Sequence, residues 1–194
     1  MDGMRWTIRR VGTLGLVLGV LASLVLAPSS HALLLSGLSN VTLRATTASS
    51  LTIAITSGTS MNFTLFQGAT ANGSTAAAIT TSWNLNPGQV GTVRLYGYFN
   101  TPSAALAGPT YDIASSYVEG RVPTGSPTTF TAFTQTNPVG PAGGSLMLFT
   151  ETITGVNKNK TRTDNLSLRV NLTTSPVVPA GTYTGTLHIQ ARAL

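Results

Sequence analysis

The chain has 194 residues, of which 42% are hydrophobic and only 8% are charged, with 11 basic residues, five acidic residues and no cysteine. The lack of cysteine excludes thiol catalysis, cysteine-based metal sites and disulfides. The high hydrophobic content excludes disorder as the reason for the scarcity of charge, and few of the basic residues cluster, so we expect no nucleic-acid partner.

The first 32 residues have the pattern of a secretory signal peptide. Three arginines among the first ten residues precede an uncharged apolar run at 11–26, which is shorter than the about 20 residues that span a bilayer. The sequence Ser-His-Ala at 30–32 then offers small residues where a signal peptidase cuts. We therefore predict cleavage after Ala32 and a secreted protein, extracellular or on the cell surface, with a single domain at 33–194.

The segment that follows, LLLSGLSNVTLRAT at 33–46, is apolar and alternating, and it is a candidate donor strand. Leu35, Val41 and Leu43 share one parity and would be the inserting side chains. Burying a leucine is worth about 1.5–3 kcal/mol relative to leaving it in water, so this segment requires a groove. The groove belongs either to the same chain, which would make the segment the first strand of a complete sandwich, or to a neighbouring copy, and the sequence leaves both interpretations open.

Beyond this segment, apolar residues recur at every second position in short runs, which is the pattern of half-buried strands. Turn signals such as Asn86-Pro87-Gly88 separate the runs, and no stretch after Ala32 has a helical period. The chain is therefore predicted to be all-β, an antiparallel immunoglobulin-like β-sandwich, with a jelly roll as the alternative. The expected strands are 51–55, 61–66, 78–85, 90–99, 117–122, 128–133, 146–153, 166–172 and 183–192.

The sequence offers no convincing catalytic or metal site. His188 is the one histidine after Ala32, and it lies on the polar face of the last expected strand. No G-x-S-x-G nucleophile motif occurs, and the acidic residues have none of the spacing of a calcium-binding loop. We expect a protein that is not an enzyme and has no cofactor.

The remaining charges suggest surface features. Glu119 and Arg121 are two residues apart on one strand face, which predicts an ion pair at the surface, and Glu151 is expected on a threonine-lined outer face. The cluster NKNKTRTD at 157–164 is predicted to form a solvated hairpin loop between two strands, with a polyanion-binding role as the alternative.

One stripe of side chains is a candidate ligand face. Arg94, Tyr96 and Tyr98 lie on the face opposite Val93 and Leu95. Tyrosine and arginine are frequent in protein interfaces, and sugar rings stack on such side chains, so the stripe is interpreted either as a covered or interface surface or as a polysaccharide platform. Trp83 is a further candidate for this face, although its alternation with Ile79 favours the core.

The C-terminal sequence VPAGTYTGTLHIQARAL at 178–194 resembles the C-terminal signature of spore-coat-U-like and related chaperone–usher pilin subunits. The resemblance implies a sandwich that lacks one strand and receives it from the N-terminal extension of a neighbouring subunit. Leu187 and Ile189 would then line the strand that the extension approaches.

Two functions are expected from these features. The first is a structural subunit of a pilus, filament or coat, whose partners are copies of itself or related subunits and a periplasmic chaperone. The alternative is a monomeric carbohydrate-binding or adhesin domain that uses the stripe at Arg94, Tyr96 and Tyr98.

Overall fold

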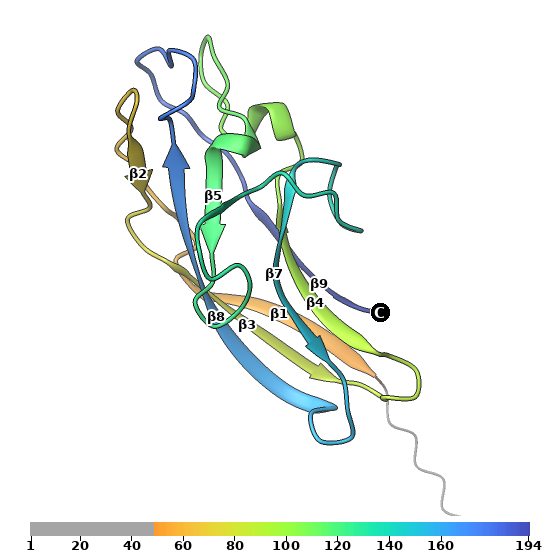
Figure 1. Ribbon diagram of the computed structural model, residues 1–194. Coiled ribbons are helices and arrows are strands. Elements are labelled where there is room, and N and C mark those ends of the chain that lie inside the picture. The colour runs from red at the N-terminus through yellow and green to blue at the C-terminus, as the bar shows by residue number, and fades with distance from the viewer. Residues whose placement is uncertain (1–48) are drawn as a thin grey trace, which may run out of the picture. The chain divides into compact units, whose positions relative to one another are not determined.

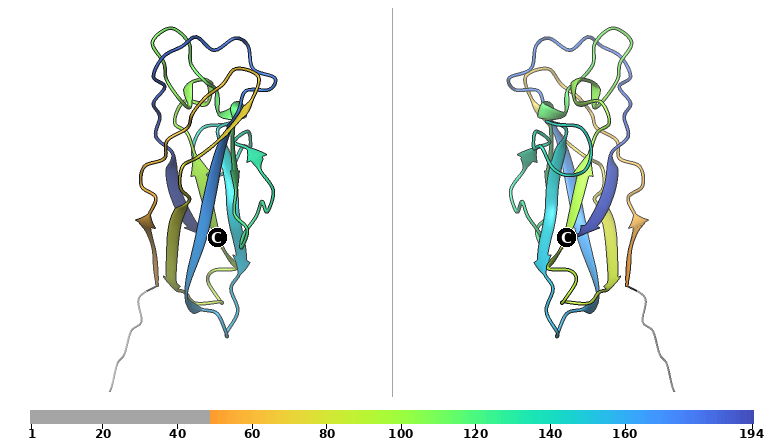
Figure 2. Two further views of the ribbon diagram at one scale, coloured as in Figure 1. Left: turned by 90° about the vertical axis from the view of Figure 1, so that its left-hand side faces the viewer. Right: turned by 90° about the vertical axis from the view of Figure 1, so that its right-hand side faces the viewer.

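The computed structural model describes residues 49–194, which form two packed antiparallel β-sheets (Figures 1 and 2). The predicted all-β antiparallel sandwich is confirmed, and its assignment to the immunoglobulin-like or the jelly-roll type stays a prediction. The strands are β1 (Ser50–Ser57), β2 (Thr70–Asn72), β3 (Ala77–Asn84), β4 (Thr92–Tyr98), β5 (Val118–Arg121), β6 (Thr131–Ala132), β7 (Ser145–Thr152), β8 (Asn159–Asn171) and β9 (His188–Ala193), and two short 3-10 helices cover Pro102–Ala104 and Ser115–Tyr117.

Several predictions from the sequence fall on residues that the structure does not describe. The signal peptide at 1–32 and the candidate donor strand at 33–46 lie outside the described residues. The same is true of the proposed inserting side chains Leu35, Val41 and Leu43.

The two sheets differ in width. The larger sheet has the order β1-β3-β8-β5-β6, with β2 paired to the end of β8, and the smaller sheet has the order β7-β4-β9. All pairings within them are antiparallel. The long strand β8 pairs with both β3 and β5, so it connects the two halves of the larger sheet.

Alternating apolar side chains of both sheets form the core. Ile79 and Trp83 of β3 and Leu166 of β8 are buried against Leu95 of β4 and Phe149 of β7. Further aromatic packing comes from outside the strands, where the rings of Phe99 and Phe133 meet edge to face with centroids 5.2 Å apart. Trp83 is only 2% exposed, as its alternation with Ile79 predicts.

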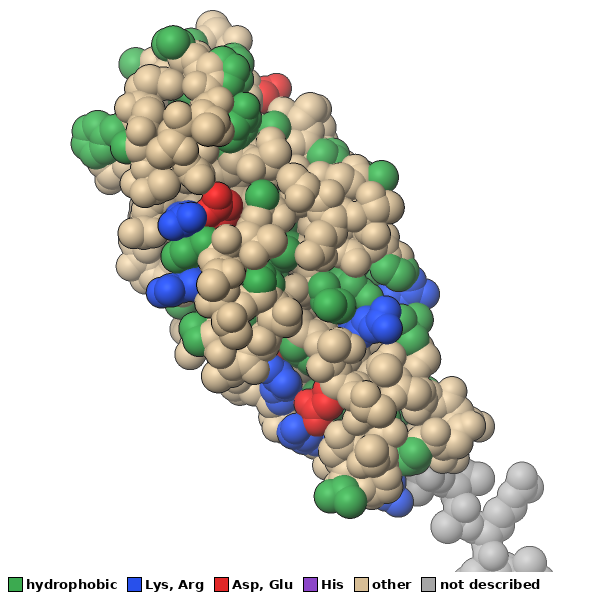
Figure 3. Space-filling view, viewed as in Figure 1, with side chains coloured by type: hydrophobic (Ala, Val, Ile, Leu, Met, Phe, Trp, Pro, Cys, Tyr) green, Lys and Arg blue, Asp and Glu red, His purple; other side chains and the backbone are tan. Residues whose placement is uncertain are grey.

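Hydroxyl pairs cover part of the outer face of the larger sheet. The side chains of Thr80 and Thr163 lie 2.9 Å apart, and those of Ser82 and Thr161 are also separated by 2.9 Å. Such cross-strand pairs add to the stability of a sheet without using charge. Charged side chains accordingly form small separate groups on the face shown in Figure 3.

One flank of the sandwich is closed by the chain that connects β5 to β7. The amide of Ser126 donates to the carbonyl of Leu148 at 2.8 Å, and Gln135 and Ser145 exchange main-chain hydrogen bonds. Phe133, from the same connection, enters the core. The edge of β7 is therefore protected, because this segment occupies the space beside it.

Four expected strands differ from the observed elements, and the last of them, expected at 183–192, is observed as β9 at His188–Ala193. Residues 61–66 alternate as predicted but form no strand, and only Thr131–Ala132 of the expected 128–133 strand pairs with a neighbour. In contrast, β8 begins at Asn159. The prediction that 157–164 is a solvated loop is therefore wrong from Asn159 onward, because Lys160, Arg162 and Asp164 continue the inward alternation of Leu166, with Lys160 exposed, Arg162 half-buried and Asp164 buried.

Phe133 tests the contribution of the β5–β7 connection to the core. We expect Phe133→Ala to lower the free energy of unfolding by about 3–5 kcal/mol, because a buried ring is removed and a cavity remains. Urea titration followed by tryptophan fluorescence measures the loss. The matched control is Phe66→Ala, whose ring is largely exposed. Equal effects of the two substitutions would contradict the packing described.

Candidate functional site: an open groove between the sheets

The flank opposite the β5–β7 connection is open. Among the described residues, β1 and β9 form no main-chain pairing with each other, although their Cα atoms approach within 8 Å. A groove of about 480 Å³ opens here between Ile55 with residues 58–63 on one side and residues 182–187 with Ile189 on the other. Its lining includes core side chains, namely Phe99, Val118, Leu166 and Leu168.

The β1 side of this flank presents apolar side chains that point inward but are not covered. Ile53 and Ile55 pair in register with Thr81 and Ile79, which are fully buried, and residues opposite each other on neighbouring strands face the same side of a sheet. Nevertheless, Ile53 is 37% and Ile55 is 42% exposed. These two side chains belong to the inner face, and the described residues leave them partly open to solvent.

The β9 side presents an unpaired strand edge. Thr92 and Leu194 exchange both main-chain hydrogen bonds, each 2.9 Å long. Because such pairs alternate along an antiparallel ladder, the register places the main-chain groups of His188, Gln190 and Arg192 toward β4. The N–H and C=O groups of Ile189, Ala191 and Ala193 point the other way, so one edge of β9 is available for a further strand.

The predicted assembly residues of the C-terminal strand lie in this groove. Leu187 and Ile189 both line it and also pack against the core. The alternation of residues in the C-terminal segment therefore predicts correctly that Leu187 and Ile189 face inward. The candidate site residues named from the sequence did not include the opposite wall, namely Ile55, Met61 and Phe63. Their alternation was visible, but the sequence does not show that the smaller sheet ends before it covers them.

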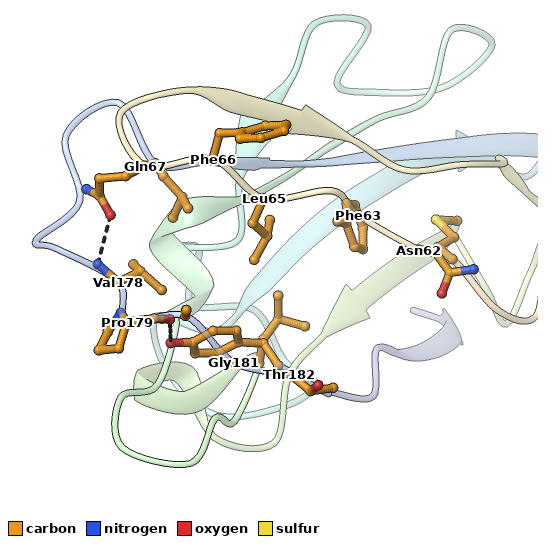
Figure 4. Close-up of a pocket in the computed structure, with 14 residues that line it drawn as sticks. Asn62, Phe63, Leu65, Phe66, Gln67, Val178, Pro179, Gly181 and Thr182 are labelled. Carbon is orange, nitrogen blue, oxygen red and sulfur yellow. Dashed lines mark hydrogen bonds between the residues drawn. The ribbon is translucent and has the colours of Figure 1, made fainter.

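The groove continues toward the end of the sandwich. A second cavity of about 640 Å³ shares Met61, Phe63 and Tyr183 with the first. In Figure 4, two chain segments face each other across it, and the side-chain oxygen of Gln67 accepts a hydrogen bond from the amide of Val178 at 2.8 Å. This bond joins the two walls at the far end, so the channel there has a defined shape.

The candidate ligand stripe is interrupted. Tyr96 is only 1% exposed, and Trp83 is in the core. Residues 138–140 lie against this face, since a Cβ atom on Gly140 would meet the ring of Tyr98 and the carbonyl of Pro138 accepts a hydrogen bond from Arg192. Tyr98 and Arg94 remain partly accessible. The continuous arginine–tyrosine surface that the sequence suggests is therefore not present.

Four charged residues form a network at one end of the sandwich that extends from the exposed Lys160 to the buried Asp164. Lys160 Nζ lies 2.6 Å from Glu151, and Arg162 bonds Asp164 at 2.6 Å while its guanidinium lies over the ring of Phe149. Asp164 is buried and also accepts a hydrogen bond from Thr124. The expectation that Glu151 sits on an outer face is wrong, because it shares the inward parity of Phe149 on β7.

The ionisation of this network follows from its contacts. Burial raises the pKa of Glu151, but hydrogen bonds from Lys160 and Asn157, together with the charges of Lys160 and Arg162, outweigh that effect and leave the pKa below its usual value. The hydrogen bond to Asp164 raises the pKa of Arg162 against the opposing effect of burial. Glu151, Lys160, Arg162 and Asp164 form ion pairs with one another, which is typical of a network that stabilises the fold.

The predicted surface ion pair of Glu119 with Arg121 is also wrong. Glu119 pairs across the sheet with Arg169 and accepts a hydrogen bond from Asn171. Arg121 instead lies over the ring of Phe130. Residues directly opposite on neighbouring strands are closer than residues two apart on one strand, so the cross-strand partner is preferred.

No arrangement typical of a catalytic or metal site is seen in residues 49–194. No group of three histidine or acidic side chains comes together there to hold a metal ion. His188 stacks on Tyr98 and bonds the amide of Asn100 at 3.0 Å. In this part of the chain, no helix is long and apolar enough to cross a membrane.

Comparison of the chain with family models, with curated proteins and with solved structures finds no match. The role of the groove is therefore inferred from its geometry.

The charge network predicts a pH dependence. Glu151 has a lower pKa in the folded protein than its ordinary value of 4.5, so the unfolded chain binds protons more readily in acid. Its contribution to stability is present above about pH 4.5 and is lost as the pH falls through the folded pKa. We expect Glu151→Gln to flatten the decline of unfolding free energy below pH 4.5, measured by urea titration at several pH values.

The control for this experiment is Asp112→Asn, since Asp112 is in no ion pair within the described residues. An unchanged slope in the Glu151 variant would show that the network contributes nothing to acid stability.

Proposed function

We propose that the chain is a secreted, non-enzymatic structural subunit of a cell-surface assembly, such as a pilus, filament or coat. In this proposal the groove accepts a β-strand from a neighbouring copy. The observation that carries it is the combination of inward-facing but exposed Ile53 and Ile55 with an unpaired edge of β9 at the same flank. An added strand would form main-chain hydrogen bonds with that edge and bury the two isoleucines.

The segment at 33–46 is the proposed donor. Its 14 residues would span about 46 Å when extended, at about 3.3 Å per residue, which is ample for a strand along β9 and the channel beyond it. Leu35, Val41 and Leu43 would face the groove, with Gly37 and Ser39 as small residues on the same side between them.

A neighbouring copy is favoured over the same chain because of where the groove opens. The donor segment joins β1 at Ser50, whereas the groove is lined by Ile55 and residues 58–63 at the opposite end of β1. Insertion into its own groove would require the chain to reverse at Ser50 and run back along β1. A second molecule can supply the strand without that reversal.

The alternative, a carbohydrate-binding platform at Arg94, Tyr96, Tyr98 and Trp83, has weaker support. Two of its four side chains are buried, so the surface it requires is incomplete.

Deletion of the proposed donor gives the first test. We expect the chain 33–194 to form ordered assemblies and the chain 47–194 to remain monomeric, because only the first carries the strand. Electron microscopy and light scattering distinguish the two. A synthetic peptide of residues 33–46 should bind the monomer and restore protection of the β9 edge in hydrogen exchange. A monomeric 33–194 chain that protects its own β9 edge would instead show self-insertion.

A proline in β9 gives a second test that leaves the donor intact. The N–H of Ala191 points away from β4, so Ala191→Pro removes a hydrogen bond that only an added strand would use. We expect this variant to fold, as judged by urea titration, but not to assemble. Ala191→Val, which keeps the N–H, is the control for side-chain size. Normal assembly of the proline variant would rule out pairing at this edge.

A further inference from the structure

Two arginines lie side by side on the outer face of the smaller sheet. Arg94 of β4 and Arg192 of β9 are register partners. Both alternate with residues that pack into the core, namely Val93 and Leu95 on β4 and Ala191 and Ala193 on β9. Because Thr92 and Leu194 form a hydrogen-bonded pair two residues away, the arginines also occupy a hydrogen-bonded position, with Cα atoms about 5.5 Å apart.

This pair lacks an acidic partner within the described residues. Every ion pair there involves other basic side chains, namely Lys160, Arg162 and Arg169. The Nε atom of Arg94 is buried and has no hydrogen-bond partner in residues 49–194, and Arg192 donates only to the carbonyl of Pro138, at 2.9 Å. Like charges directly opposite each other weaken a sheet, and an unpaired buried donor adds to the cost.

Figure 3 shows basic side chains together on the flank where Figure 1 places β4 and β9, with apolar side chains around them and no acidic side chain adjoining. This face is separate from the groove, which lies between the sheets. A strand bound in the groove would leave the arginines accessible.

We propose that Arg94 and Arg192 form a binding site for an oxyanion carried by an acidic polysaccharide. Guanidinium groups bind carboxylate and sulfate oxygens through paired, charge-assisted hydrogen bonds. A bound oxyanion would neutralise the repulsion between the two cations.

The surroundings of the pair favour a sugar polymer over a second copy of the chain. On the same face, about 13 Å along β4 at 3.3 Å per residue, Tyr98 stacks on His188 with ring centroids 5.3 Å apart, and Asn100 bonds that histidine. The ring of Tyr98 is in contact with His188 and with residues 138–140, whereas Asn100 is exposed and offers an amide to a sugar hydroxyl. A second copy offers few acidic side chains from its described residues, because Asp112 is the one aspartate or glutamate side chain there outside an ion pair.

Binding of fluorescently labelled polygalacturonate to the full chain tests the proposal, with neutral dextran as the uncharged probe and inorganic sulfate as competitor. We expect saturable binding of polygalacturonate, none of dextran, and a loss of about tenfold in affinity for Arg94→Gln and for Arg192→Gln, the size expected for charge-assisted hydrogen bonds. Arg121→Gln is the matched control, because it removes the same charge from another sheet.

Thermal melting separates binding from folding. Both substitutions remove a like-charge contact, so we expect a melting temperature equal to or above that of the parent chain. The proposal is overturned if polygalacturonate does not bind, if Arg121→Gln weakens binding as much as the other two, or if inorganic sulfate binds at the arginines and the polymer does not.

Discussion

A sheet of three strands cannot cover the inner face of one that is five strands wide. The position of the uncovered part determines most of the molecule's other features. Strands lie about 4.8 Å apart, so each strand missing from the smaller sheet leaves that width of apolar surface without a partner. On one flank the β5–β7 connection fills the deficit with Phe133 and with main-chain bonds to Leu148 and Ser145. On the other flank no described residue does so, and Ile53 and Ile55 remain accessible.

This asymmetry links the fold to the proposed assembly. The exposed isoleucines represent hydrophobic free energy that folding of residues 49–194 leaves unused, and the edge of β9 represents unused main-chain hydrogen bonds. One extended segment would satisfy both requirements together, which is why a strand suits the site better than a small ligand would. The arginine pair at Arg94 and Arg192 belongs to a different face, so assembly and polyanion binding can be tested independently.

Local periodicity was sufficient to predict much of this structure. Alternation located β1, β3, β4 and β7, and it assigned Leu187 and Ile189 to the inner face, since the period of two is a property of each strand alone. The pairing of residues far apart in the sequence could not be predicted from this period. Glu119 meets Arg169 rather than Arg121, and Arg94 meets Arg192, because register depends on distant segments. The prediction of a loop at 157–164 was wrong because its charges suggested solvent, whereas Lys160 and Arg162 are strand residues that form ion pairs with Glu151 of the facing sheet.

The hydroxyl pairs of the larger sheet have a consequence for how the molecule behaves in a crowded environment. Thr80 with Thr163 and Ser82 with Thr161 give that surface polarity without net charge. Dissolved ions screen charges but have little effect on neutral dipoles. The free energy of association between two such surfaces should therefore change little with ionic strength, at low salt as at high salt.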